Sequence, residues 1–162
     1  MTRTTRRMAR PAELRGAVDR FATGVVVVAA GRGRPRWVTA AAFNSLSLDP
    51  PLLLWCVAQR TVADLALEVD CACGLSVLAS GQERLVHCSN ADAETAWEHG
   101  EILGAPLVAG AAAAFEVVVV RRVLHGDHEL FVGEVAGFSY VAGRTGLARY
   151  SGAVALPALA GG

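Results

Sequence analysis

The apolar residues of this chain occur in short runs, each about the length of one β-strand. The most prominent runs are Val25–Ala30, Leu52–Ala58 and Val117–Val120. A membrane-spanning helix needs roughly 20 consecutive apolar residues, so no run predicts one. The pattern instead predicts about six or seven strands and three short helices. Strands that outnumber helices and do not alternate with them favour a mostly antiparallel β-barrel with peripheral helices over a parallel doubly wound sheet.

The length of 162 residues fits a single domain. Residues 1–10 are basic and irregular, and we expect a flexible arm there. The folded domain is expected over residues 11–152. Residues 153–162 are rich in Ala, Gly and Pro and are expected to form a flexible tail.

Three segments carry helix signals. Pro11 opens an apolar pattern of helical spacing that we expect to end at Gly24. Thr61 is positioned to cap a second short helix. Ser80 and Glu83 have the spacing of a capping box, which predicts a third helix.

The remaining segments read as strands and turns. The sequence predicts a hairpin in which the residues from His125 to His128 join two long strands. Asp49-Pro50-Pro51 should end a strand, because proline cannot donate to a sheet ladder. The further expected strands are 37–43, 44–48, 73–78, 112–124 and 129–140, with an acidic surface segment over 90–104.

Composition limits the classes of function. Formal net charge is zero, so the chain has no electrostatic footprint for nucleic acid or an anionic membrane. Apolar residues make up 53%, an excess that points to an oligomer interface. Every basic side chain is Arg and none is Lys, so a bound phosphate must be held by Arg, hydroxyls or backbone N–H groups.

The four cysteines, Cys56, Cys71, Cys73 and Cys88, have neither disulfide nor zinc-site spacing. No secretory signal follows the N-terminal arginines, so we expect a cytoplasmic protein with free thiols packed in its core and no metal.

Gly31 and Gly33 follow a strand, as in a dinucleotide-binding fingerprint. That fingerprint needs a third glycine and an immediate helix, whereas Arg36 stands at the third position and Pro35 disfavours the helix. We therefore reject a Rossmann site.

Two segments carry candidate chemistry. Ser45 and Ser47 alternate with Leu46 and Leu48, which predicts two hydroxyls on one strand face and two leucines in the core. Hydroxyls beside unpaired backbone groups could cradle a planar heterocycle and a phosphate. The alternative is an ordinary β-bend with surface serines.

The second segment is the turn that ends at His128. Gly126 permits the tight turn, and Asp127 can orient an imidazole that projects beside the barrel mouth. The alternative is an ordinary hairpin whose residues merely suit the turn.

Taken together, these segments resemble the flavin reductase-like family. Its members are split-barrel proteins that serve as reductase components of two-component flavin monooxygenases. The agreement runs in order over roughly residues 14–152. The segments that carry it are Phe21–Val25, Thr39-Ala40, Phe43–Leu52, Cys73–Leu78 with Gln82, Gly126–His128 and Phe131–Val135.

The resemblance implies a Greek-key-like split barrel, working as a homodimer, that uses NADH or NADPH to reduce FMN or FAD for a partner monooxygenase. It implies a catalytic role for His128, with Asp127, His128 and Tyr150 at the nicotinamide nucleotide. The residues implied at the flavin are Thr39, Ala40, Asn44, Ser45, Leu46, Ser47, Leu48, Asp49, Cys56, Val57, Ala58, Thr61, Ser80 and Gln82.

Departures from the family pattern, such as Ala41 in place of Asn or Ser, leave the choice between FMN and FAD open. The choice between NADH and NADPH and the identity of the oxygenase also stay open. Two other classes remain: a non-catalytic flavin- or haem-binding split-barrel protein, and a scaffold for an oxygenase.

Overall fold

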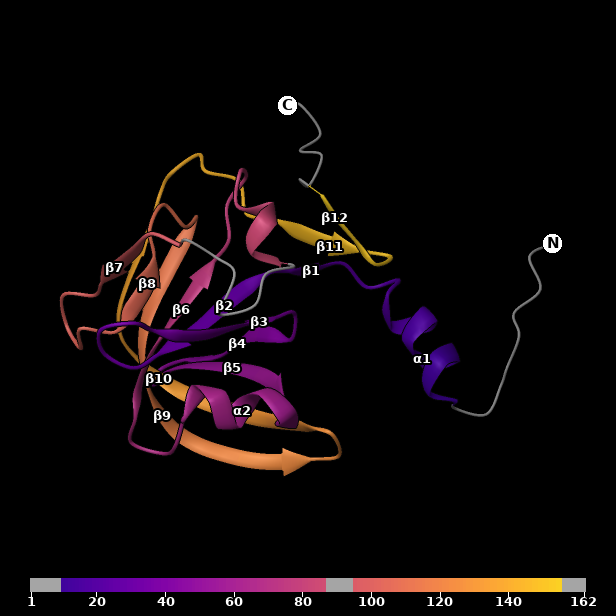
Figure 1. Cartoon of the computed structure of the whole chain (residues 1–162), viewed down its shortest axis with the longest axis horizontal. Coiled ribbons are helices and arrows are strands. Elements are labelled where there is room, and N and C mark those ends of the chain that lie inside the picture. Colours follow the sequence, from indigo (N-terminus) through magenta and orange to yellow (C-terminus); the bar gives the residue numbers. More distant parts are fainter. Residues whose placement is uncertain (1–9, 87–94, 156–162) are drawn as a thin grey trace.

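A computed structural model gives the fold and describes residues 10–86 and 95–155. Its centre is a seven-stranded sheet in which every neighbouring pair is antiparallel, in the order β3-β2-β6-β9-β10-β5-β4 (Figure 1). The strands are β2 (Val26–Ala30), β3 (Arg36–Ala40), β4 (Phe43–Leu48), β5 (Pro51–Ala58), β6 (Ala72–Val77), β9 (Ala113–His125) and β10 (His128–Tyr140). The expected mostly antiparallel β fold is confirmed.

The sheet curls into a barrel because its two edge strands follow one another in the chain. Only Ala41 and Ala42 separate β3 from β4, so the two edges must lie close together. The Cys56 N–H donates to the Ala42 carbonyl at 3.0 Å across this seam. The single strand expected over 37–43 is therefore divided, and the division is what closes the barrel.

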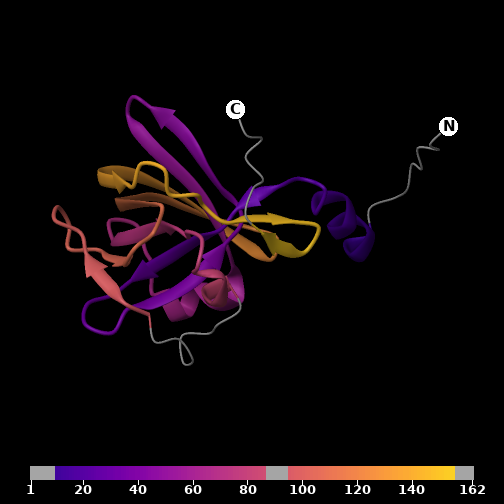
Figure 2. The ribbon, with the colours of Figure 1, turned by 90° about the horizontal axis from the view of Figure 1, so that it is seen from above.

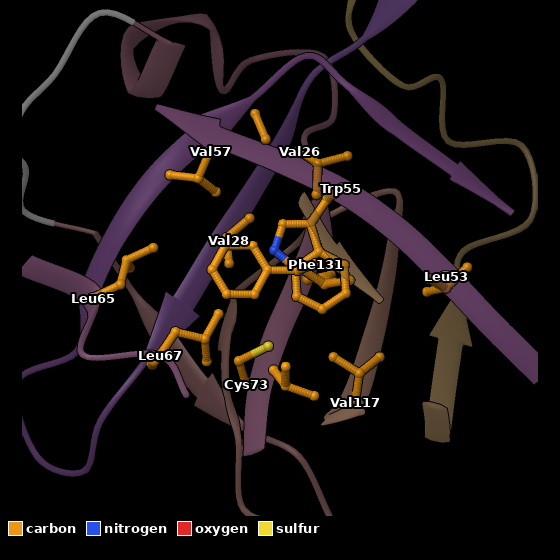
Figure 3. Close-up of a cluster of buried hydrophobic side chains, with 14 of the residues drawn as sticks. Val26, Val28, Leu53, Trp55, Val57, Leu65, Leu67, Cys73, Val117 and Phe131 are labelled. Carbon is orange, nitrogen blue, oxygen red and sulfur yellow. The ribbon is translucent and has the colours of Figure 1, made fainter. Parts of the chain in front are cut away.

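The barrel interior is packed with side chains from both halves of the sheet (Figure 3). Trp55 on β5 stacks on Phe131 on β10 with ring centroids 5.6 Å apart, and both are fully buried. Val28, Leu75 and Val117 complete the surrounding wall. A second apolar cluster, which includes Val27, Trp37, Leu78, Leu85 and Leu147, covers the other face of β2.

Smaller elements surround the barrel (Figures 1 and 2). The helix α1 lies apart from the barrel in both views, whereas α2 packs against β3 and β5. These elements are α1 (Pro11–Val18), α2 (Gln59–Leu65), the 3₁₀ turn η1 (Glu83–Val86), the β1-β11-β12 sheet (Thr23–Gly24, Ala148–Tyr150, Ala153–Ala155) and the β7-β8 pair (Trp97–His99, Pro106–Val108). No helix among the described residues is long and apolar enough to cross a bilayer.

The hairpin of β9 and β10 forms as predicted. The residues of the rejected dinucleotide fingerprint form the tight connection between the antiparallel strands β2 and β3.

Cys73 is buried, and Cys56 and Cys71 are half-buried; all three are free thiols. Cys88 lies outside the described residues. Burial raises the pKa of the Cys73 thiol and, to a lesser degree, that of Cys56. The surface segment expected over 90–104 is described from residue 95, where it contains β7.

The helix ends differ from expectation. The first helix ends at Val18 rather than Gly24, because Thr23 and Gly24 pair with β11. Thr61 is not a cap: it lies inside α2, where its hydroxyl donates to the Ala58 carbonyl at 2.7 Å.

The capping-box prediction is also wrong. Ser80 is followed by a single 3₁₀ turn that begins at Glu83, and the Gln82 side chain accepts from the Ala79 N–H in the tight bend before it. At the other end, part of the expected tail pairs with β11 as β12.

The predicted alternation along β4 is wrong. A bulge at Leu46 sets Ser45 opposite Leu53 and Ser47 opposite Leu52. Consecutive residues of β5 face opposite sides of the sheet, so the two serines do not share a face. Leu46 and Leu48 are not in the core either, since they are 52% and 88% exposed.

Candidate active site

One cavity lies between α1 and the mouth of the barrel. Its volume is about 710 Å³, within the range of small-molecule sites. Turns and strand ends supply its polar side chains, and α1 supplies an apolar wall. The lining residues are Pro11, Leu14, Arg15, Val18, Asp19, Phe21, Thr23, Ala41, Asp127, His128, Arg149 and Ser151.

His128 enters this cavity from the first position of β10. Its Nδ1 lies 2.8 Å from Asp127 Oδ1, which fixes the ring in the turn. The Asp127 carbonyl accepts from the Gln59 N–H at 2.9 Å, so the turn is also tied to the start of α2. The hydrogen bond to His128, together with its charge, lowers the pKa of Asp127, which therefore stays a carboxylate at neutral pH.

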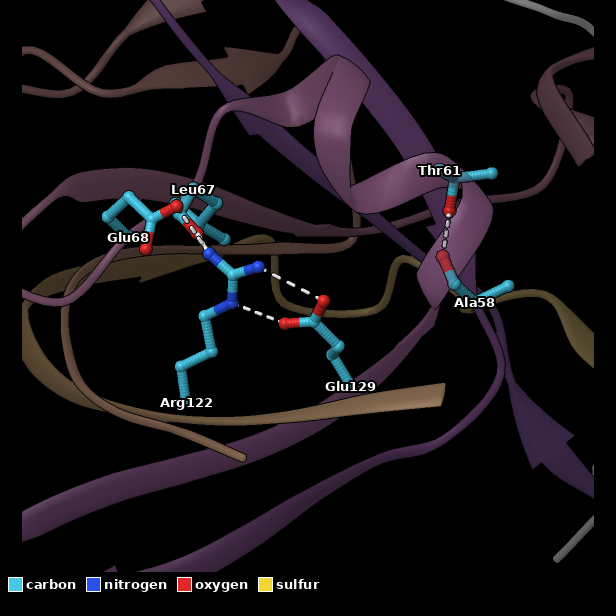
Figure 4. Close-up of polar contacts among 6 residues, drawn as sticks. All are labelled: Ala58, Thr61, Leu67, Glu68, Arg122 and Glu129. Atoms are coloured by element: carbon cyan, nitrogen blue, oxygen red, sulfur yellow. Dashed lines mark hydrogen bonds and ion pairs between the residues drawn. The ribbon is translucent and has the colours of Figure 1, made fainter. Parts of the chain in front are cut away.

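An ion-pair network anchors the hairpin that carries His128 (Figure 4). The Arg122 guanidinium on β9 donates to both carboxylate oxygens of Glu129, the residue after His128. It also pairs with Glu68, reaches the Leu67 carbonyl at 3.3 Å and lies 6.0 Å from the Phe131 ring centroid. Arg122 thereby joins the base of the hairpin to the segment after α2.

A second cavity adjoins the first. It has a volume of about 200 Å³ and contains the predicted flavin residues Thr39 and Ala40. Ala41 and Arg149 line both cavities, so the two cavities lie on either side of these residues. The structure thus brings the predicted Thr39-Ala40 segment next to the predicted His128 turn.

The predicted residues of β4 lie elsewhere in the single chain. Ser45, Ser47 and Leu48 line an apolar groove of about 520 Å³ whose other wall includes Phe115 and Phe138. Asn44, Leu46 and Asp49 are exposed at the same hairpin and do not line a described cavity.

The predicted residues of β5 and α2 already have partners within the fold. The Val57 side chain is buried in the barrel core, and Cys56 is half-buried on the other face of the strand. Ala58 pairs with His128 in the ladder, and its carbonyl accepts from Thr61.

The segment after β6 is a structural bend. The Gln82 side chain accepts from the Ala79 N–H and donates to the Ala109 carbonyl, both at 2.9 Å. Ser80 is exposed, and its N–H donates to the Thr145 carbonyl. Neither residue lines a described cavity, although Val86 of the following turn lines the smaller one.

Sequence reasoning missed Arg149. The expected residue of β11 was Tyr150, but alternate residues of a strand face the same side. Arg149, which faces the opposite side of β11 from Tyr150, lines the larger cavity together with Ser151 of the following turn, whereas Tyr150 does not. The signal available in the sequence was the absence of lysine, which makes each arginine a candidate for a phosphate.

The geometry suits binding and orientation rather than acid–base catalysis. The His128–Asp127 pair is largely exposed, and a paired imidazole can hydrogen-bond a polar ligand. The two neighbouring cavities have volumes of about 710 and 200 Å³. Ligands bound in neighbouring cavities would lie close together, as a transfer between two bound molecules requires.

Comparison with known proteins gives a consistent result. Residues 18–155 match the model of the flavin reductase like domain. The NADH-dependent FAD reductase of Streptomyces globisporus is 39% identical over 132 residues, which cover 76% of this chain and 72% of that protein. The reductase component of 4-hydroxyphenylacetate 3-monooxygenase from Thermus thermophilus is 39% identical over 127 residues, covering 74% of this chain and 78% of the relative.

Solved structures agree with these sequence matches. The Streptomyces globisporus C-1027 NADH:FAD oxidoreductase SgcE6, in complex with NAD and FAD fragments, superposes with a TM-score of 0.81 at 35% identity. The superposition covers 93% of this chain and 96% of that structure.

Proposed function

The chain belongs to the flavin reductase-like family, and from that premise we propose that it is an NAD(P)H-dependent flavin reductase. The reaction is hydride transfer from a nicotinamide nucleotide to FMN or FAD, and the chemistry belongs to these two ligands. The observation that carries the proposal is that the His128 cavity and the Thr39-Ala40 cavity are neighbours that share the lining residues Ala41 and Arg149.

The chain's own residues bind, orient and exclude water. Thr39 and Ala40 hold the flavin edge, and His128, oriented by Asp127, donates to the nicotinamide nucleotide. The apolar side of α1 shields the larger cavity. The other predicted flavin residues, on the β4 hairpin, line a groove that would join the site if a second chain packed against it.

That consideration supports a homodimer as the active form. Large apolar side chains are exposed on β4, on β10 and after α1, including Phe21, Leu48, Phe138 and Tyr140. Isologous contacts between two copies would cover such a surface and bring the β4 residues of one copy toward a neighbouring site. Activity is assigned to one domain over residues 11–152, in the cytoplasm, where its free thiols would persist.

The reduced flavin passes to a partner monooxygenase, as the name of the Thermus thermophilus relative indicates for that protein.

The deciding experiment is anaerobic oxidation of NADH and NADPH by the purified protein with added FMN or FAD. We expect flavin-dependent consumption of at least one donor. Flavin binding without consumption would favour the non-catalytic module, and failure to bind flavin would favour the scaffold.

A further inference from the structure

Arg149 occupies the wall between the two cavities. It lies in the middle of β11, directly opposite Thr23 of β1 in the ladder. Residues directly opposite in an antiparallel pair point to the same face, so the side chains of Thr23 and Arg149 share a face, and both line the larger cavity. Ser151 lines the same cavity two positions along the chain.

The Arg149 guanidinium has no hydrogen bond or ion pair to any residue that the structure describes. Two other strand arginines have partners: Arg122 is paired with two carboxylates, and Arg36 contacts Asp64. Arg121 on β9 has none among the described residues, but it is exposed to water. Arg149 is nevertheless half-buried, and a half-buried charge without a partner is unfavourable unless a ligand supplies one.

The carboxylates in the cavity do not supply that partner. Asp127 is held by His128, and Asp19 lines the cavity without an ion pair to Arg149. Arg15 of α1 adds a second guanidinium to the same lining. In a chain without lysine, this is where an anionic ligand would find a cation and two hydroxyls together.

We propose that Arg149, with Thr23 and Ser151, forms the phosphate-binding subsite of the larger cavity. The ligand is a phosphate group of a nucleotide, since the planar guanidinium matches two phosphate oxygens at once and the hydroxyls donate to the third. The inference rests on the proposed function. Two sources share this chemistry: the phosphate of the flavin and the diphosphate of the nicotinamide nucleotide.

The test compares ligands that carry phosphate with analogues that do not. Binding of FMN and of riboflavin is followed by quenching of flavin fluorescence, a readout that needs no turnover. For the hydride donor, the KM for NADH is compared with the KM for N-benzyl-1,4-dihydronicotinamide, which carries no phosphate. The variants are Arg149→Gln and Arg149→Lys, and the control is Arg34→Gln, in the exposed turn at the opposite end of β3.

We expect Arg149→Gln to weaken one phosphate-bearing ligand by about tenfold or more, the loss expected for a charged hydrogen bond, and its phosphate-free analogue by less than about twofold. Arg149→Lys should recover part of the loss, because lysine keeps the charge but not the paired donors. Loss for FMN assigns the flavin phosphate, and loss for NADH assigns the nicotinamide nucleotide.

Equal losses for ligands with and without phosphate would overturn the proposal, as would no loss for any ligand. If the Arg149 variants do not fold, the wild type decides: FMN binding no tighter than riboflavin, and NADH used no better than its phosphate-free analogue, would also overturn it. Absence of donor oxidation by the wild type would refute the proposed function instead, while the flavin-binding arm would still test the subsite.

Discussion

His128 lines the larger cavity and is hydrogen-bonded through Nδ1 to Asp127, which leaves Nε2 available to a ligand. If it binds the nicotinamide nucleotide, His128→Ala should raise KM for NADH about ten- to a hundredfold, the equivalent of a hydrogen bond to a charged group of about 1.5–3 kcal/mol. Flavin binding should be unchanged. Steady-state kinetics with varied NADH, together with flavin titration, measures both.

His125→Ala is the matched control, since His125 faces His128 across the same hairpin but does not line the cavity. An unchanged KM for NADH in the His128 variant would remove His128 from the site. Equal effects in the two variants would indicate that only the hairpin had been disturbed.

Arg122 and Glu129 illustrate how a buried charge depends on its partner. The Glu129 side chain is 8% exposed, and both of its oxygens accept from Arg122. The hydrogen bonds from Arg122 to the carboxylates of Glu129 and Glu68 raise the pKa of the guanidinium above its usual value. Arg122→Leu should lower the free energy of unfolding by about 3 kcal/mol, because it leaves a buried carboxylate unpaired.

The double variant Arg122→Leu with Glu129→Leu should be less destabilised than Arg122→Leu alone, since it removes the unpaired charge as well. Urea denaturation of the two variants provides the comparison. If the double variant is the less stable of the two, the ion pair itself is a net source of stability and the reasoning fails.

At the scale of elements, one carboxylate holds the connection between β7 and β8 against the barrel. Glu116 on β9 is buried and accepts from the N–H groups of Ile102, Leu103 and Ala105. Glu116→Ala should lower the free energy of unfolding by about 2 kcal/mol, because it removes three hydrogen bonds and leaves the buried Ala105 N–H unpaired. Denaturant titration beside the exposed-site control Glu134→Ala checks this, and similar effects of the two variants would contradict it.

The sequence predicts elements well where local pattern and tertiary context agree. The long apolar runs of β9 and β10 flank a turn that contains Gly126, and they pair in the structure as predicted. It fails at β4, where a bulge at Leu46 places Ser45 and Ser47, which were expected on one face, on opposite faces of the strand. The bulge depends on how β4 pairs with β5, and no residue of β4 alone specifies it.

The candidate site, like the fold, can be predicted only where a local sequence pattern positions the residue. His128 is carried by a recognisable hairpin, so its place beside a cavity follows from the sequence. Arg149 lies on a three-residue strand with no pattern of its own, and its position depends on pairing with Thr23, more than a hundred residues earlier in the chain. Such a contact is determined only when the whole chain is folded.

At the scale of the whole molecule, exposed apolar side chains predict assembly. Leu48 is 88% exposed at the β4–β5 hairpin, and Tyr140 is 72% exposed at the end of β10. We expect sedimentation to give twice the 16.9 kDa mass of one chain, and Leu48→Asp to shift the protein toward the monomer with loss of activity. A fully active wild-type monomer at micromolar concentration would contradict this.

The proposed reaction also requires the flavin to leave. The cavities are open to solvent at His128 and Asp127, and Arg60 near the turn is exposed, where water and salt screen its charge. One phosphate subsite at Arg149 and a few hydroxyls orient a flavin without holding it strongly, and weak binding speeds the release of product. We therefore expect a flavin Kd near micromolar, or about 8 kcal/mol of binding free energy, and saturation kinetics in added flavin. Dialysis followed by an NADH oxidation assay with added flavin tests whether the flavin is weakly bound. The dialysed protein should be colourless, and it should be inactive until flavin is added. A protein that stays yellow with one flavin per chain, and whose rate does not respond to added flavin, would show that the flavin is a resident prosthetic group instead of a substrate.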